Sequence, residues 1–400
     1  MSNRISSNMM YDQSVALMLS KQSKMNHLEQ QLATGKKIVT AKDDPVASGT
    51  AVGLDRVLAE LEQLGKNANG AQNRLGLQEN TLAQANELLA RVSELTVQAN
   101  NAALSAEDRK TVSAELQSIK DQMLALANTT DGNGRYLFGG AADGAAPFTL
   151  ANGTVTYNGD QIQRQVEVAP GMFVKDALPG SEVFLRIRTG DGTVDAAAVA
   201  GNTGKAVLTD ISRDGSGSWN GDSYTLRFTA ADTYEVVDAS NTVVGTGTYK
   251  TGEDIVFQGL RVRIEGTPAA GDAFSAGQAG TRDVFSTIDQ LVQTLQMDTS
   301  TEAGRTAQQN ALQASMRDVA RASGSLIDAR AAGGAQLKSI DDAASLREAS
   351  SITLESSLSQ LRDLNYAEAI GQYQLEGAAL QAAQTIFTQM QSMSLFNMIR

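Results

Sequence analysis

The chain has 400 residues and a formal net charge of −12, and 42% of its residues are hydrophobic, 20% charged and 5% aromatic. This composition is ordinary for a folded soluble protein, and the length suffices for two or three domains. Because aromatic side chains are scarce, we expect helices that pack through Leu, Ala and Val or thin sheets, rather than one large globular core. The lack of cysteine excludes disulfides and thiolate metal sites, and the acidic balance argues against nucleic acid as a partner.

The first predicted helix carries one apolar seam and ends at Gly35. Gly35 is a natural helix stop, and the lysines at positions 36 and 37 suit the negative end of the helix dipole. The apolar residues of this helix recur every seven positions, as in a coiled coil. They are Tyr11, Met18, Met25 and Leu32.

Residues 1–42 differ in charge from the rest, with six Lys or Arg against Asp12 and Glu29, a net charge of +4. Solvated lysines explain this excess better than an acidic partner does. Residues 1–19 lack the continuous apolar core and the cleavage site of a secretory signal. If the protein is exported, we therefore expect it to leave by another route.

Asp44 and Pro45 mark the start of a second helix. Asp44 is placed to accept backbone N–H groups as the N-cap, and Pro45 suits the first helical position, where its missing donor costs nothing. The adjacent pair Asp43 and Asp44 is the alternative candidate for a cation site. Two carboxylates without further oxygen ligands favour the cap.

A long helical rod follows, built from two stretches of sequence. The first stretch covers residues 54–99, and a capping-box pattern at Ser105 and Asp108 starts another amphipathic helix that ends before residue 131. Helical periodicity returns at residue 285 and continues to residue 364. The predicted seam of this rod consists of Leu54, Leu61, Leu75, Leu82, Leu89, Leu312, Val319, Leu326 and Ile340.

Between residues 139 and 282 the composition changes, and four of the five prolines and the single tryptophan lie there. Short alternating or β-branched runs bounded by Gly and Asp predict antiparallel strands. The weak stretch 191–204 either divides two small sheets or is a loop within one domain. The expected strands are residues 154–157, 163–168, 183–187, 224–228, 234–237, 243–249, 255–257 and 260–264.

The last helix, from residue 366 to residue 399, has an apolar seam and no charge between Glu376 and Arg400. A helix with so few charged residues should be covered by other helices on nearly all sides. Its many side-chain amides and hydroxyls argue against a membrane-spanning helix. We expect it to pair antiparallel with the first helix and to bury the remaining surface against other copies. Its predicted assembly residues are Tyr366, Ile370, Tyr373, Leu380, Phe387 and Met390.

These elements predict an α+β fold in which a long antiparallel helical coiled coil or bundle from both chain ends carries a central antiparallel β insertion. We expect a terminal coiled-coil assembly domain (1–42 and 364–400), a helical rod (43–138 and 283–363) and an outward β domain (139–282), in one or two subdomains.

No constellation of catalytic residues emerges from the sequence. The only histidine, His27, lies among polar positions of a helix, where it is more often solvated or packed than catalytic. No nucleophile elbow, phosphate-binding loop or zinc motif is present. We therefore predict a protein that is not an enzyme and has neither a cofactor nor a metal.

Several stretches resemble the bacterial flagellin superfamily. Similarity to flagellin itself runs through residues 31–38 (QLATGKKI), 41–49 (AKDDPVASG), 91–98 (RVSELTVQ) and 364–369 (LNYAEA). Other stretches are similar to the hook-associated branch of the superfamily, which forms the junction between hook and filament. These are residues 5–11 (ISSNMMY), 136–140 (YLFGG), 379–383 (ALQAA) and 394–396 (SLF).

The resemblance implies a structural adaptor outside the cell, with flagellin as the alternative identity. Members assemble with copies of themselves, with the first hook-associated protein and with flagellin, and an export chaperone and the flagellar type III apparatus deliver them uncleaved. A free-standing coiled-coil adhesin is a further alternative. No nucleic acid and no membrane insertion is expected.

Overall fold

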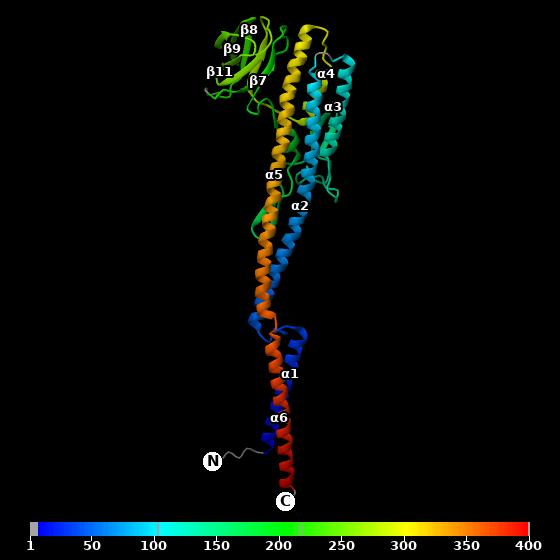
Figure 1. The fold of residues 1–400 in the computed structure, drawn as a ribbon, viewed down its shortest axis with the longest axis vertical. Coiled ribbons are helices and arrows are strands. Elements are labelled where there is room, and N and C mark those ends of the chain that lie inside the picture. Colours follow the sequence, from blue (N-terminus) through cyan, green and yellow to red (C-terminus); the bar gives the residue numbers. More distant parts are fainter. Residues whose placement is uncertain (1–6, 102–103, 216, 218, 399–400) are drawn as a thin grey trace. The chain divides into compact units, whose positions relative to one another are not determined.

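The computed structural model describes residues 7–101, 104–215, 217 and 219–398, and it divides into two compact units. Unit 1 comprises Met1–Lys66 with Ala343–Arg400, and unit 2 comprises Asn67–Asp342. Figure 1 shows the helices and strands in the colours of the sequence. Two long helices, α2 (Pro45–Ala99) and α5 (Glu302–Arg362), contribute residues to both units.

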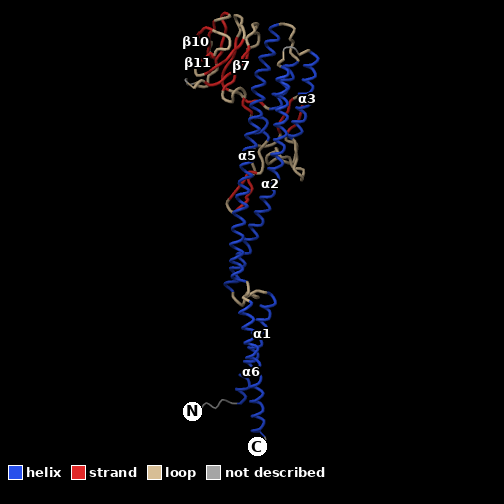
Figure 2. Tube along the Cα trace, in the orientation of Figure 1, coloured by secondary structure: helices blue, strands red, loops and turns tan. Residues whose placement is uncertain are grey.

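The described residues of unit 1 are helical apart from turns and an isolated β-bridge between Lys36 and Asp363. Helix α1 (Ser7–Thr34) packs against α6 (Tyr366–Met398), and the start of α2 and the end of α5 complete the unit (Figure 2). The pair is antiparallel, because Lys21 meets Glu376 whereas Tyr11, earlier in α1, meets Phe387, later in α6. The predicted antiparallel pairing of the two terminal helices is therefore confirmed.

Gly35 ends α1, as the sequence predicts. Its φ is +70°, its N–H donates to the carbonyl of Gln31 at 2.8 Å, and a Cβ atom here would lie 2.8 Å from the hydroxyl of Tyr366. Only glycine adopts this backbone region without strain, and its lack of a side chain also leaves room for the hydroxyl of Tyr366. The same turn is tied to the end of α5, since Lys37 N–H donates to the carbonyl of Arg362 at 2.7 Å.

The helical part of unit 2 contains segments of α2 and α5 together with α3 (Ala106–Ala127) and α4 (Val284–Leu295). Helix α3 begins with the predicted capping box, in which Ser105 and Asp108 each bond to the other's backbone. One hydrophobic core joins these helices. Its largest fully buried side chains include Leu82, Leu89, Leu95, Leu116, Met123 and Phe285.

Three small β elements lie against the helices of unit 2, two of them in the helical core and the hairpin β3–β4 through hydrogen bonds to Asn67 and Gln336. They are the hairpin β1 (Phe148–Ala151) with β2 (Thr154–Tyr157), the hairpin β3 (Gln165–Ala169) with β4 (Met172–Lys175), and the pair β5 (Ile187–Arg188) with β14 (Thr281–Arg282). The rings of Phe148 and Phe184 are buried in the same core, where Phe148 lies 5.7 Å from the ring of Phe285.

The strand expected over residues 183–187 is wrong. Most of this run forms η1, a short π-helical turn (Ser181–Leu185), and only residue 187 lies in a strand. The turn follows Pro179 and Gly180, and it directs Val183 and Phe184 together into the helical core, whereas successive residues of a strand point to opposite faces.

The other strands form two antiparallel sheets around a second core. The five-stranded sheet has the order β10-β9-β8-β13-β6, and the three-stranded sheet has the order β11-β12-β7. Alternate residues of both sheets, such as Leu226 and Phe228 on one and Val262 and Ile264 on the other, are buried in one shared core. The strands are β6 (Val194–Ala198), β7 (Val207–Arg213), β8 (Tyr224–Ala230), β9 (Thr233–Asp238), β10 (Val243–Thr248), β11 (Asp254–Phe257), β12 (Leu260–Glu265) and β13 (Ala273–Gln278).

The region from 139 to 282 therefore divides between two cores. Residues 148–187 contribute to the helical core, and residues 194–276 form their own. Strand β6 lies within the weak stretch 191–204 and pairs with β13, so this stretch is part of a sheet. We call residues 191–278 the β module.

This division predicts where the chain tolerates a deletion. Thr189 N–H donates to the carbonyl of Gly280 at 3.2 Å, so the two ends of the β module lie side by side. Replacing residues 191–278 by a two-residue turn should leave the helical core of unit 2 folded, because β5 and β14 can form a closed hairpin. The melting temperature of this deletion variant, monitored by circular dichroism, tests whether the helical core stays folded.

A larger deletion that joins Leu137 to Asp283 serves as the comparison. It removes Phe148 and Phe184, each of which contributes about 3–5 kcal/mol as a buried aromatic side chain. We expect this variant to lose cooperative unfolding. If the two variants melt alike, Phe148 and Phe184 do not belong to the helical core.

Candidate assembly interface

The α1–α6 pair in unit 1 is held by apolar contacts along one side of each helix. The rings of Tyr11 and Phe387 lie 5.1 Å apart, and Lys21 Nζ lies 2.7 Å from Glu376 Oε2. The hydrogen bond from Lys21 lowers the pKa of Glu376 below its usual value, so this carboxylate stays ionised in the contact.

The predicted assembly residues divide by exposure. Tyr11, Tyr366 and Ile370 are exposed, although Tyr11 contacts Phe387 and the hydroxyl of Tyr366 lies close to Gly35. In this stretch Ala369, 4% exposed, is the buried neighbour of Ile370. The half-buried members are Met18, Met25, Leu32, Tyr373, Leu380, Phe387 and Met390.

The outer surface of the same pair is unusually apolar. Leu19 is 63% exposed, Leu375 68% and Ile386 57%, and Leu17 and Met9 are also exposed. Two helices alone therefore leave large hydrophobic side chains in water. An exposed apolar surface of this kind marks a site of association with other proteins.

The apolar surface continues along the rest of unit 1. Val46 is 80% exposed at the start of α2, and Ile352 is 60% exposed near the end of α5. Val52 and Leu346 are exposed as well. Not only α1 and α6 but also the parts of α2 and α5 that belong to unit 1 thus present apolar side chains to solvent.

The turn between α1 and α2 contains the expected cap residues. Asp44 Oδ1 accepts the N–H of Ala47 at 2.9 Å, and Pro45 is the first residue of α2. Asp43 accepts the N–H groups of Val39 and Thr40 at 3.0 and 2.8 Å, and these bonds lower its pKa. His27 lies 3.7 Å from Asp43, so the only histidine supports this turn.

Nearly all predicted seam residues of the rod are buried. Leu54 is half-buried, and each of the others is at most 6% exposed. The buried ones are Leu61, Leu75, Leu82, Leu89, Leu312, Val319, Leu326 and Ile340.

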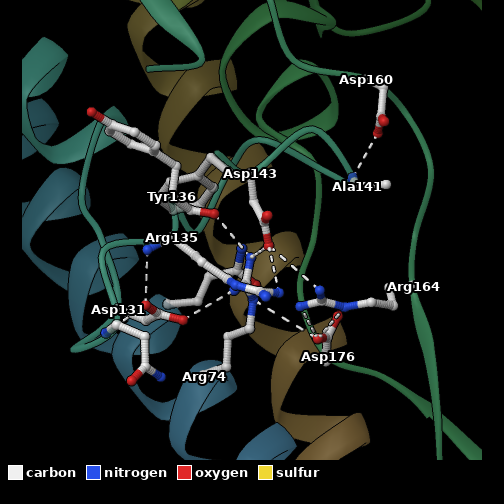
Figure 3. A network of polar contacts seen from close by, with 12 residues as sticks. Arg74, Asp131, Arg135, Tyr136, Ala141, Asp143, Asp160, Arg164 and Asp176 are labelled. Atoms are coloured by element: carbon white, nitrogen blue, oxygen red, sulfur yellow. Dashed lines mark hydrogen bonds and ion pairs between the residues drawn. The ribbon is translucent and has the colours of Figure 1, made fainter. Parts of the chain in front are cut away.

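A buried charge cluster fastens the irregular segment after α3 to α2 in unit 2 (Figure 3). Arg74 is 6% exposed, and its guanidinium lies 3.3 Å from Asp131, 3.5 Å from Asp143 and 3.9 Å from Asp176. It also donates to the carbonyl of Tyr136 at 2.9 Å.

Other polar contacts extend this fastening. Arg164 bridges Asp176 at 2.6 Å and Asp143 at 3.4 Å. Gln78, one turn beyond Arg74, exchanges two hydrogen bonds of 3.0 Å with the backbone of Leu178. These contacts position the hairpins and η1 against the rod.

Sequence reasoning missed this cluster. Its aspartates are more than forty residues from Arg74 along the chain, and no local spacing links them. The sequence held one sign of the cluster, because two polar residues, Arg74 and Gln78, lie near the predicted seam residue Leu75, where buried partners could be expected for them.

In the described part of the chain, no group of three or more His, Cys, Asp or Glu side chains is arranged to hold a metal ion. None of the described helices combines the length and the apolar character needed to cross a membrane.

Comparisons with known proteins agree with this architecture. Residues 5–143 match the family model of the bacterial flagellin N-terminal helical region. The chain is 28% identical to flagellar hook-associated protein 3 of Salmonella typhimurium over 398 residues, which cover 99% of this chain and 100% of that protein. Flagellins also match, over shorter segments.

Solved structures of FlgL share the fold. FlgL of Xanthomonas campestris is 60% identical with a TM-score of 0.72, and the match covers 76% of this chain and 99% of that one. The flagellar junction protein FlgL of Legionella pneumophila is 27% identical with a TM-score of 0.70, covering 78% and 99% respectively.

Similarity over the full length of the chain separates this protein from the flagellins, which it matches only in part. The chain belongs to the family of flagellar hook-associated protein 3 (FlgL) and is a structural component of the bacterial flagellum.

Proposed function

We propose that the protein joins the flagellar hook, through the first hook-associated protein, to the flagellin filament. The observation that carries this proposal is the apolar outer surface of the α1–α6 pair, with Leu19, Leu375 and Ile386 more than half exposed. Copies of the chain, the first hook-associated protein and flagellin supply further helices with matching apolar faces.

Assembly follows from the energetics of these helices. A side chain such as Leu375 stabilises an interface by about 1.5–3 kcal/mol when it is buried. The α1–α6 pair alone leaves several such side chains unburied, so neighbouring subunits complete its packing. Assembly thus adds stability to the terminal helices in particular.

Each domain of the chain has its own role in this proposal. Residues 1–42 and 364–400 form the assembly domain, residues 43–138 and 283–363 the rod, and residues 139–282 project outward, although the segment up to residue 187 also supports the rod. The rod seam packs the rod helices together, and the cap at Asp44 and Pro45 starts α2 directly after the assembly helix α1. The protein has no catalytic role.

We further propose that the protein works outside the cell and is secreted without a cleaved signal peptide. A flagellar export chaperone and the type III export apparatus deliver it. Terminal helices that gain stability on assembly suit passage through a narrow channel, because they need not be fully stable before they reach their neighbours.

Addition of purified protein to isolated hooks that carry the first hook-associated protein tests this function. Hooks that receive the protein should nucleate filaments from flagellin monomers, and hooks without it should not. If flagellin polymerises equally well on both, the protein is not the adaptor. If the protein polymerises by itself into long filaments, it acts as a flagellin.

A further inference from the structure

Unit 2 contains a small cavity lined by arginines and amides at one end of its helices. The end of α2, the first turn of α3 and the start of α5 line this cavity, which has a volume of about 110 Å³. The three segments lie at the same end of the helical part of unit 2 in Figure 1. Its polar lining includes Asn100, Arg109, Thr299, Arg305, Gln308 and Gln309.

Two guanidinium groups meet at one residue of the lining. Arg109 Nη2 donates to the hydroxyl of Thr299 at 3.0 Å, and Arg305 Nη1 donates to the carbonyl of the same residue at 3.1 Å. Arg109 also donates to the carbonyl of Leu104 at 3.1 Å. Arg109 is half-buried and Arg305 is exposed, so both positive charges act on the same side of the cavity and favour an anion there.

Among the residues that the structure describes, no carboxylate lies within ion-pair distance of either guanidinium group, and the charge of Glu302 acts on Arg305 only from farther away. Neither Arg109 nor Arg305 forms an ion pair there, whereas Arg91, on α2, pairs with both Glu94 and Glu115. Three of the acidic groups on the flanking turns bond elsewhere, and the fourth, Glu107, is exposed and forms no ion pair with either arginine. Asp298 accepts the N–H of Ser300, Glu302 bonds to Lys205 at 2.7 Å, and Asp108 bonds to Ser105.

The surrounding backbone favours a negative charge as well. Helices α3 and α5 begin at Ala106 and Glu302, so the positive ends of two helix dipoles lie beside the cavity. The end of α2 contributes carbonyl groups of opposite polarity, and the two guanidinium charges exceed this partial charge.

We propose that this cavity is a binding site for a carboxylate, held between the guanidinium groups of Arg109 and Arg305. A carboxylate has two oxygens in one plane, and paired N–H donors of guanidinium groups bind such a group with good geometry. The carboxylate comes either from an Asp or Glu side chain of a neighbouring protein molecule or from a small organic acid in solution.

The first test measures the melting temperature of the full-length protein in potassium acetate and in potassium chloride at equal ionic strength. The wild type should melt about 2–4 °C higher in acetate, because a ligand that binds the folded state raises its stability. The double variant Arg109→Gln/Arg305→Gln should lose this difference while keeping amide donors at both positions.

Lys110→Gln is the matched control. It removes one positive charge from the same turn of α3, at an exposed position outside the cavity lining, and it should keep the full acetate effect. An equal acetate effect in the wild type and in the double variant would refute the site. Stabilisation by sulfate without any by acetate would refute its assignment to carboxylates.

A photoreactive phenylalanine analogue in place of Gln309 identifies the source of the carboxylate. A crosslink from this position to another subunit in assembled flagella would assign the site to an acidic side chain of that subunit. An acetate effect without such a crosslink would assign it to a small organic acid.

Discussion

Cells that carry Leu380→Asp/Phe387→Asp protein should keep their hooks but shed flagellin as unanchored monomers. Both side chains lie on the half-buried side of α6, and the ring of Phe387 lies 5.1 Å from that of Tyr11. Each substitution removes about 1.5–3 kcal/mol of apolar burial and adds the desolvation of a carboxylate, which costs several kcal/mol more. The variant should be missing from flagella purified from these cells.

The rod and the β module do not contain this seam, so the variant should still fold and reach the medium. Leu380→Met/Phe387→Leu is the matched control, since it changes the same two positions but keeps an apolar side chain at each. We expect the control to support motility. Normal attached filaments with the double Asp variant would show that the seam is not needed, and retention inside the cell would show that α6 serves export.

Replacement of Arg74 by Met should destabilise unit 2 by about 3 kcal/mol, because it leaves buried carboxylates without their cation. Asp143 and Asp176, 8% and 5% exposed, would lose a partner that Arg164 replaces only in part. Hydrogen exchange should accelerate over residues 131–182 first, since this segment is fastened to α2 by the cluster.

Arg91→Met is the control for this variant. Arg91 lies on the same helix and pairs with Glu94 and Glu115, but 47% of its side chain is exposed. Exposed ion pairs contribute little to the stability of the fold, so the rate of hydrogen exchange over residues 131–182 should stay unchanged in this control. Equal protection of this segment in the Arg74 variant and in the wild type would show that the cluster does not fasten it.

The same cluster makes unit 2 sensitive to acid. Burial alone would raise the pKa of Asp131, but the N–H donors of Arg135 and Asn133 and the charge of Arg74 outweigh burial and lower it. A lowered pKa stabilises the fold above the ordinary pKa of an aspartate, and this stability is lost as the pH falls through the folded-state value. The Arg74→Met variant should therefore lose less stability on acidification than the wild type.

Periodicity predicted the helices well because each of them buries a stripe that repeats along its own sequence. The seam from Leu61 to Leu89 and the seam from Leu312 to Ile340 are buried as expected. At Gly35 and Ser105 the chemistry of a single turn sufficed to predict where a helix ends or begins.

The β region was harder to predict, because its burial depends on residues distant in sequence. Residues 183–187 have the composition of a strand, yet Phe184 packs on Phe148 and Phe285 and the chain turns to accommodate it. Strand β6 is rich in alanine and becomes a strand through its pairing with β13. Arg74 and its aspartates meet only once the tertiary structure forms.

The junction role is tested most directly by immunogold labelling of intact flagella with antibodies against the β module. A structural adaptor between hook and filament should give one narrow band of gold at the hook end of each flagellum. Label along the whole filament would contradict this account and identify the protein as a filament subunit.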